Sequence, residues 1–285
     1  MAANGIRGID HLLVGTPDLE AARRAWARLG FSITPRGRHV GWNTGNYCIM
    51  FPGDYVELIG VVDASQPASS IVRRIAEVGE GMIGVALATG DAAAAHAALT
   101  AAGIAAEPPR ELVRVLELPE GAVTPRFSLV NLPAGATPHI PMFLCQHLSP
   151  ELVRRPEWIA HANGATGVAS VTAVVANPRA AMGAYARLLG PAAVGLTDEI
   201  LTLRIGKATV LLARPADIDV LYPWIDAEAL RLPALIAATF TARDLGATAH
   251  VLSEAGVPYE LEGGGRSVVV RPRHATGVLV EFAEA

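Results

Sequence analysis

The sequence predicts an α+β fold built from four copies of one βαβββ module. A pattern of strand, helix and further strands recurs four times along the 285 residues. In three copies the helix runs from an Asp to a Gly with equal spacing, at 18–30, 91–103 and 244–256. Gly-containing turns then separate short alternating apolar runs, which is typical of hairpins. Because one such module cannot bury its sheet face alone, we expect the modules to pair.

The first copy predicts a helix at 17–29 that follows a strand at 9–14. Thr16 is a suitable N-cap, Pro17 suits the first helical position, and Asp18 complements the positive end of the helix dipole. Gly30 can adopt the left-handed conformation that ends a helix. The further strands of this copy are expected at 31–33, 46–51 and 55–60.

The other copies follow the same order. Their first strands are expected at 83–87, 168–175 and 235–241, and their helices at 91–102, 178–189 and 244–255. Their later strands are expected at 104–105, 127–132, 142–146, after Pro191, 200–205, 208–213, 257–259, 266–270 and 277–282.

Paired modules predict two domains. The first would span 1–148 and contain modules 8–62 and 81–147. A linker at 149–165 would join it to a second domain at 166–285, formed by modules 167–214 and 233–285.

Composition excludes several classes of protein. With 51% hydrophobic and 18% charged residues the chain can bury a sizeable core. A net charge of -4 and the lack of a basic cluster argue against a nucleic-acid partner. No apolar run of ~18 residues predicts a membrane span, and the N-terminus does not resemble a signal peptide. We therefore expect a cytoplasmic protein with a small-molecule substrate and no membrane partner, and a homodimer is compatible with the sequence.

Two polar residues stand out in apolar strands. His11 lies in the strand at 9–14 and Glu57 in the strand at 55–60. A lone buried carboxylate is costly, so these side chains need each other or a metal ion. The two cysteines, Cys48 and Cys145, form neither a disulfide framework nor a zinc motif.

The motifs together resemble the vicinal oxygen chelate superfamily, in particular its glyoxalase-like subgroup of glyoxalase and bleomycin-resistance proteins. The segments that carry the resemblance are 8–12, 16–18, 38–47, 55–60, 146–151 and 161–164. The resemblance implies that two modules form an open, U-shaped barrel. It also implies a divalent metal held by a first-strand His and a last-strand Glu, which are His11 and Glu57 here.

The second copy departs from that pattern. Counting back from Asp91 places Gly84 at the first-strand position. On its last strand Cys145 or His147 could replace the second Glu, and His147 is the better metal ligand. The predicted ligand set is therefore His11, Glu57 and His147, which suits Fe, Mn, Ni or Zn.

The second domain departs further. Its first-strand positions are Ala237 in copy four and either Val171 or Thr172 in copy three. Since none of these side chains is a suitable metal ligand, we expect this domain to support the first without a metal.

Further residues are expected around the metal. Glu57 and His39 are the expected catalytic residues, and the expected substrate contacts are His39, Trp42, Asn46, Cys145 and His161. For His39 and Asn46 the alternative is local turn chemistry, and for His161 it is a linker role.

The resemblance implies a metal-dependent lyase, isomerase or extradiol dioxygenase acting on a small oxygenated molecule. The alternative is a metal-free protein that binds or sequesters small molecules, as antibiotic-resistance members do. A third possibility is a structural or regulatory protein whose ancestral site has lost its function.

Overall fold

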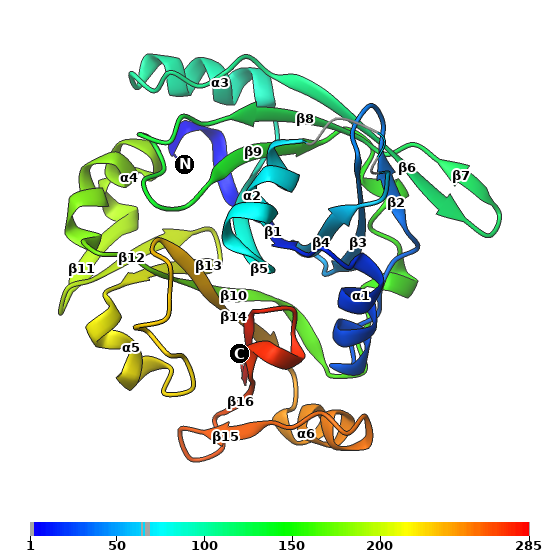
Figure 1. Cartoon of the computed structure of the whole chain (residues 1–285). Coiled ribbons are helices and arrows are strands. Elements are labelled where there is room, and N and C mark those ends of the chain that lie inside the picture. Colours follow the sequence, from blue (N-terminus) through cyan, green and yellow to red (C-terminus); the bar gives the residue numbers. More distant parts are fainter. Residues whose placement is uncertain (1–2, 64, 66–68, 285) are drawn as a thin grey trace.

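The computed structural model describes residues 3–63, 65 and 69–284. In Figure 1, β10 and β14 of the second unit run below β1 and β5 of the first unit. Each unit contains two βαβββ modules, and the fold is mixed α+β as predicted. Among the described residues, we find no helix with the length and apolarity needed to cross a membrane.

The first unit is a closed β-barrel. Its strands are β1 (Ile6–Gly15), β2 (Gly37–His39), β3 (Thr44–Met50), β4 (Tyr55–Val61), β5 (Gly81–Thr89), β6 (Arg110–Leu118), β8 (Arg126–Asn131) and β9 (Met142–His147). Pairing runs from β1 through β4, β3 and β2, and in the other direction through β5, β9, β8 and β6. The pairing of β2 with β6 closes the ring, and the short strand β7 (Gly121–Val123) extends β6 beyond it.

Closure differs from the open barrel that the family resemblance implies. It depends on β6, which the sequence analysis did not predict, and on β2, which replaces the strand expected at 31–33. Gly37 pairs with Leu116 and His39 with Arg114 in this ladder. Because both edges pair, no free edge remains between these two strands.

The second unit is an open sheet. Its strands are β10 (Ala165–Val174), β11 (Val194–Thr197), β12 (Ile200–Ile205), β13 (Ala208–Ala213), β14 (Ala234–Ala242), β15 (Glu260–Glu262), β16 (Ser267–Val270) and β17 (Leu279–Glu284). They pair in the order β11, β12, β13, β10, β14, β17, β16 and β15. Within the described ranges, no ladder joins β11 to β15.

The module helices begin at aspartate caps. α1 (Leu19–Arg28), α3 (Ala92–Ala101) and α6 (Leu245–Glu254) follow Asp18, Asp91 and Asp244, whose side chains accept backbone N–H groups of the first turn. Asp18, and not Thr16 as predicted, is thus the N-cap of α1. Thr16 instead accepts a hydrogen bond from the Asp18 N–H through its hydroxyl oxygen.

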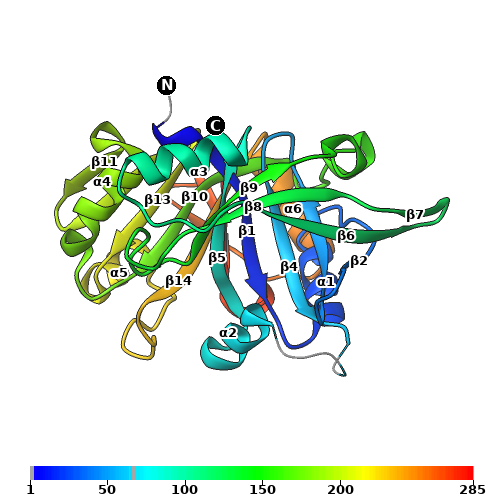
Figure 2. The ribbon, with the colours of Figure 1, turned by 90° about the horizontal axis from the view of Figure 1, so that it is seen from above.

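The fourth module helix is α4 (Met182–Leu189), and two further helices lie between modules. α2 (Ser70–Val78) lies beside the ends of β1 and β5 in Figure 2. α5 (Pro215–Leu221) follows β13 in the second unit.

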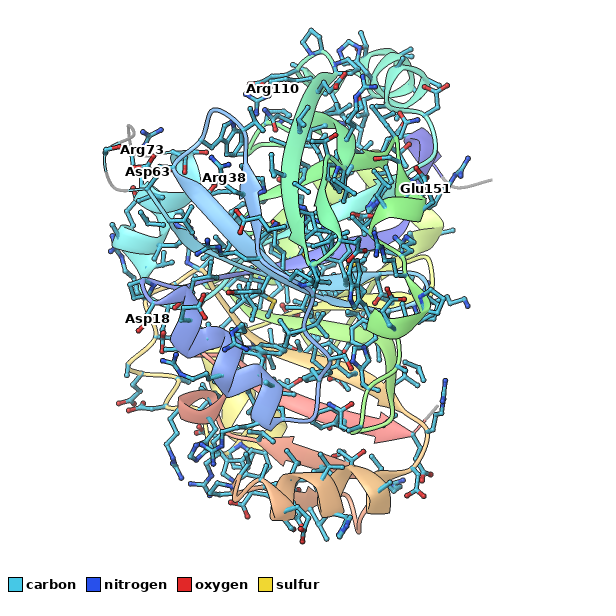
Figure 3. The ribbon with its side chains drawn as sticks, turned by 90° about the vertical axis from the view of Figure 1, so that its right-hand side faces the viewer. Asp18, Arg38, Asp63, Arg73, Arg110 and Glu151 are labelled. Atoms are coloured by element: carbon cyan, nitrogen blue, oxygen red, sulfur yellow. The ribbon has the colours of Figure 1, made fainter. Side chains whose placement is uncertain are left out.

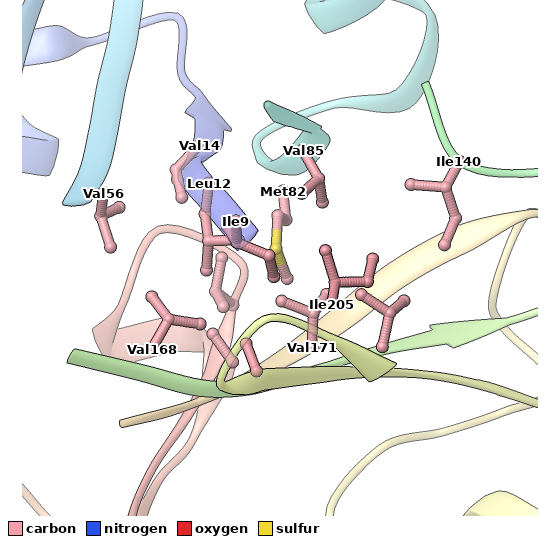
Figure 4. Close-up of a cluster of buried hydrophobic side chains, with 14 of the residues drawn as sticks. Ile9, Leu12, Val14, Val56, Met82, Val85, Ile140, Val168, Val171 and Ile205 are labelled. Carbon is pink, nitrogen blue, oxygen red and sulfur yellow. The ribbon is translucent and has the colours of Figure 1, made fainter. Parts of the chain in front are cut away.

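The two units share one hydrophobic core. Alternate residues of β1 point to opposite sides, so Leu12 and Val14 enter this core while His11 and Leu13 face the barrel interior. Figure 4 shows residues of both units meeting: Ile9, Leu12, Val14, Val168, Val171 and Ile205. The barrel interior is thereby left free for a site.

Candidate active site

A β-bulge at Asp10 shapes the site. Ile9 pairs with Leu87 and His11 with Ala86, so Asp10 is an extra residue in β1. Bulges re-aim side chains, and here Asp10 and His11 are both buried and in contact. The Nδ1 atom of His11 lies 2.7 Å from Oδ2 of Asp10. Burial opposes the ionisation of Asp10, but hydrogen bonds from His11 and His147 hold its pKa well below the usual value.

Glu57 lies between two imidazoles. Its Oε2 atom is 3.5 Å from Nε2 of His11, and its Oε1 atom is 3.6 Å from Nε2 of His39. The side-chain amide of Asn46 donates a hydrogen bond to Oε1. Burial opposes ionisation, but the contact with His39, the charge of His11 and the Asn46 amide lower the pKa of Glu57 to about 2. Glu57 is therefore ionised at neutral pH.

Aromatic rings and a hydroxyl group hold the two imidazoles. Tyr55 stacks on His11 with ring centroids 4.4 Å apart, and Phe143 meets the same ring edge-on at 5.6 Å. On β2, Nδ1 of His39 lies 2.9 Å from the Thr44 hydroxyl oxygen. Each imidazole is thus anchored through Nδ1 and presents Nε2 toward Glu57.

His147 is directed elsewhere. Its Nε2 atom lies 3.1 Å from Asp10, and its ring meets Phe127 edge-on at 4.9 Å. It is not among the residues that line the cavity described below. The structure therefore places His147 behind Asp10, and His39 rather than His147 beside Glu57.

Strand register shows which residue of the second module occupies the position that Glu57 has in the first module. Leu12 pairs with Val56 next to Glu57, and the matching pair in that module is Val85 with Met142. Phe143, and neither Cys145 nor His147, thus occupies the counterpart position of Glu57.

Strand register also corrects the residue that counting along the sequence placed at the His11 position in the second unit. β10 carries a bulge like that of β1, since Val168 pairs with Phe240 and Ser170 with Thr239. Ser170, and neither Val171 nor Thr172, corresponds to His11, and Leu211 corresponds to Glu57.

His161 has a structural position. Its Nδ1 accepts the N–H of Ser32 at 3.0 Å, and its Nε2 lies 3.0 Å from the Met50 carbonyl oxygen. Its ring packs edge-on against Phe31 and Phe51, and burial lowers its pKa. It does not line the cavity, and it fastens the linker to the first unit.

The barrel encloses a cavity of about 640 Å³. Inward side chains of its strands line it, including the predicted residues His11, His39, Trp42, Asn46, Glu57 and Cys145. Glu107, Arg110 and Ala134 line it and are exposed, so they mark its mouth. Val153 and Trp158 of the linker segment pack with Tyr55 and other barrel residues.

Sequence reasoning missed several residues of this cavity. Tyr55 and Phe143 flank His11, Asp10 orients it, and Arg114 enters from β6. The usable signal for Arg114 was an Arg at the centre of the otherwise apolar stretch 112–116.

Comparisons with known proteins agree with this architecture. A family model described as a glyoxalase-like domain matches residues 9–189. A search of curated proteins finds no match.

Three solved structures are similar over nearly the whole chain. A hypothetical protein from Staphylococcus aureus superposes with a TM-score of 0.69 at 11% identity, covering 97% of this chain and 99% of that one. A triple mutant of 4-hydroxymandelate synthase from Streptomyces coelicolor gives 0.62 at 12% identity, covering 98% and 93%. A xylose isomerase-like TIM barrel/4-hydroxyphenylpyruvate dioxygenase fusion protein gives 0.62 at 15% identity, covering 99% of this chain and 49% of its own.

At these identities the solved structures show the fold, while the family model covers more than half of the chain. The repeated modules, the buried His11 and Glu57 and this match agree: the chain belongs to the glyoxalase-like domain family of the vicinal oxygen chelate superfamily.

Proposed function

We propose that this protein is a metal-dependent enzyme that acts on a small oxygenated molecule inside the barrel of the first unit. The observation that carries the proposal is the orientation of His11. Its Nδ1 contacts ionised Asp10, and its Nε2 faces ionised Glu57 at 3.5 Å. A neutral imidazole with its proton on Nδ1 would offer the Nε2 lone pair, and with the Glu57 carboxylate it would supply two donors of the kind that divalent metal ions bind.

The distance between the two donor atoms also fits a bound metal ion. The 3.5 Å between Nε2 of His11 and Oε2 of Glu57 exceeds an ordinary hydrogen bond. Two ligand atoms bound to one tetrahedral ion lie about 3.3 Å apart. The carboxylate of Asp10 behind His11 is the usual outer partner of a metal-ligating histidine.

We propose His39 as the third ligand, in place of the His147 that the sequence favoured. Nε2 of His39 is 3.6 Å from Glu57, whereas Nε2 of His147 contacts Asp10. Two imidazoles and one carboxylate suit Fe, Mn, Ni or Zn.

A different donor set is less suitable. Among the described residues, Asp10, His11 and Cys145 are the set of three whose donor atoms all lie within 4.8 Å of one another, whereas His11 and His39 approach different oxygens of Glu57. However, burial and the charge of Asp10 raise the pKa of the Cys145 thiol well above its usual value, and a metal needs the thiolate. Asp10 is also already bound to both His11 and His147.

The metal ion and the residues of the protein would contribute different parts of the chemistry. A divalent ion supplies Lewis-acid polarisation of a substrate oxygen, as lyases, isomerases and extradiol dioxygenases of this superfamily use it. Glu57 supplies negative charge at neutral pH and Asn46 orients it. Tyr55 and Phe143 pack on His11 and exclude water from its ring.

Metal content tests the proposal. Protein incubated separately with Fe(II), Mn, Ni or Zn and then desalted is analysed by mass spectrometry, and we expect about one ion per chain. His11→Ala and Glu57→Gln should lose the ion, and His39→Ala should retain less. His147→Ala, Cys145→Ala and the exposed controls His250→Ala and Glu254→Gln should bind as wild type does.

Two outcomes would contradict the proposal. The first is an ion retained in both His11→Ala and Glu57→Gln. The second is wild-type protein without stoichiometric metal, which together with tight binding of an apolar ligand would support metal-free sequestration in the 640 Å³ cavity.

A further inference from the structure

Arg114 is a buried cation in the cavity wall. It lies on β6, lines the cavity and is only 4% exposed. Its Nη1 donates to the Cys48 sulfur at 3.0 Å, and its Nε has no hydrogen-bond partner. Across the described residues, no carboxylate forms an ion pair with it within 4.0 Å. The guanidinium therefore faces the cavity without a counter-charge in contact.

The neighbours of Arg114 do not supply that charge. Burial raises the pKa of Cys48, so its thiol is neutral at physiological pH. Glu57 acts on Arg114 electrostatically, but its oxygens already contact His11, His39 and Asn46. Since a guanidinium stays charged and an unpaired buried charge is strongly unfavourable, an anion from outside the chain would satisfy this position.

The absence of a side chain at Gly37 leaves room for the side chains of Arg114 and Asn46. A Cβ atom at Gly37 would lie 2.7 Å from Cδ of Arg114 and 2.2 Å from Oδ1 of Asn46. That Oδ1 atom is also buried without a hydrogen-bond partner. Arg114 and Asn46 thus approach the same point of the wall formed by β2, β3 and β6, and each keeps one buried polar atom without a hydrogen-bond partner.

The rest of the cavity is apolar around this position. The guanidinium of Arg114 lies over the Phe127 ring at 5.7 Å, and Leu112, Leu129 and Phe143 line the same cavity. Such walls suit a hydrocarbon or aromatic body.

The mouth carries further positive charge. Arg110 lies over Trp42 at 5.4 Å and is exposed at the start of β6 (Figure 3), and Arg74 also lines the cavity. The lining carboxylate at the mouth is Glu107, which accepts a hydrogen bond from Asn131. Because Arg74 is paired with Glu77, Arg110 supplies the further positive charge at the mouth, where Glu107 also lies.

We propose that Arg114 binds the carboxylate of an organic acid whose apolar body lies against Phe127, Leu112 and Phe143. A planar carboxylate can accept from the terminal guanidinium nitrogens in the bidentate geometry that Arg–carboxylate pairs adopt. Asn46 Oδ1 then accepts a hydroxyl or amino proton of the same acid. The proposal deepens the proposed function by giving its substrate class, but it stands on the cavity wall and not on the metal.

Matched ligand pairs test the proposal. The probes are 3-phenylpropionate, 4-phenylbutyrate and 2-naphthylacetate, each compared with its neutral primary amide by isothermal titration calorimetry. For at least one pair, wild type should bind the acid about 10- to 100-fold more tightly than the amide. Arg114→Met should lose that preference and Arg114→Lys should keep part of it. Arg126→Met is the matched control, because Arg126 is exposed and paired with Glu111 on the barrel exterior.

A thermal melting curve shows whether the Arg114→Met variant is still folded. Removing an unpaired buried charge should leave Arg114→Met at least as thermostable as wild type. A stabilised variant that has lost the acid preference is the signature of a binding residue, whereas a large loss of thermostability would contradict the proposal.

Further outcomes separate this proposal from the metal proposal. All titrations are repeated on protein stripped with a chelator, where the acid preference should persist. A preference that disappears with the metal would assign the carboxylate to the ion and overturn the role of Arg114. No preference for any acid, a preference kept in Arg114→Met, or tighter binding of inorganic phosphate would overturn it as well. Absence of metal alone would contradict the proposed function and leave this inference standing.

Discussion

The hydroxyl groups of Thr172 and Tyr222 lie 2.9 Å apart inside the second unit. By strand register Thr172 corresponds to Leu13, which lines the cavity of the first unit. Tyr222 comes from the segment that contains α5, and it packs there with Ile218 and Ile236. The second unit thus fills with its own chain the space that the first unit keeps for a ligand.

This filling predicts a stability role for Tyr222. Tyr222→Ala should lower the free energy of unfolding by about 3–5 kcal/mol because it leaves a cavity. Tyr222→Phe should cost about 1 kcal/mol through the lost hydrogen bond. Urea denaturation measures both, with Tyr259→Phe, at a more exposed position, as control. Metal content should be unchanged, and a loss of metal in Tyr222→Phe would contradict the division of roles between the units.

Asp10 should control metal affinity through His11. In Asp10→Asn the amide oxygen can still accept from Nδ1, but the charge behind the ring is lost. If His11 is a ligand, we expect about 10- to 100-fold weaker binding in a chelator competition assay. Asp18→Asn, at the N-cap of α1, should bind as wild type does. Equal affinities in wild type and Asp10→Asn would show that the Asp10–His11 contact does not act on an ion.

Asp54 predicts a pH dependence of stability. Its Oδ1 accepts the N–H of Val168 at 3.0 Å and so joins the two units. Burial raises its pKa to about 6 from 3.8, although the bond from Val168 opposes this. The folded state therefore keeps a proton that the unfolded chain releases near pH 3.8, so this contribution to stability falls as pH rises from about 4 to 6.

Asp54→Asn removes the titration and keeps an acceptor for Val168. At pH 8 we expect it to be more stable than wild type by on the order of 2–3 kcal/mol, with the difference vanishing below pH 4. Denaturant unfolding at several pH values measures this, with the exposed Asp219→Asn as control. A variant less stable than wild type at pH 8 would show that the ionised carboxylate is favourable there.

Gly37 should tolerate no side chain. In Gly37→Ala the new methyl group would meet Asn46 and Arg114, so we expect a destabilisation of about 1–3 kcal/mol. The preference for acids over amides should fall too, because both side chains must move. Gly53→Ala, where a Cβ meets nothing within 4 Å, is the matched control. Unchanged ligand preference in Gly37→Ala would show that neither side chain is held in place by this contact.

Much of the architecture could be predicted from local patterns. Asp18, Asp91 and Asp244 each begin a helix that ends at a positive-φ glycine, and capping depends on residues close in sequence. The placement of His11 and Glu57 in buried strands also followed from the apolar runs around them, and the structure shows that these two strands pair. These features depend on the chain within a few residues of each position.

The tertiary structure alone decided the shape and contents of the site. Barrel closure joins Gly37 to Leu116, and no local pattern specifies which distant strand a short edge will pair with. Asp10, the extra residue of the bulge, contacts His147, while His39 lies beside Glu57. A bulge depends on how two strands fit across a ladder, and a cavity depends on which inward side chains meet. Both are properties of packing between segments far apart in the chain, which is why Arg114 became visible only in the fold.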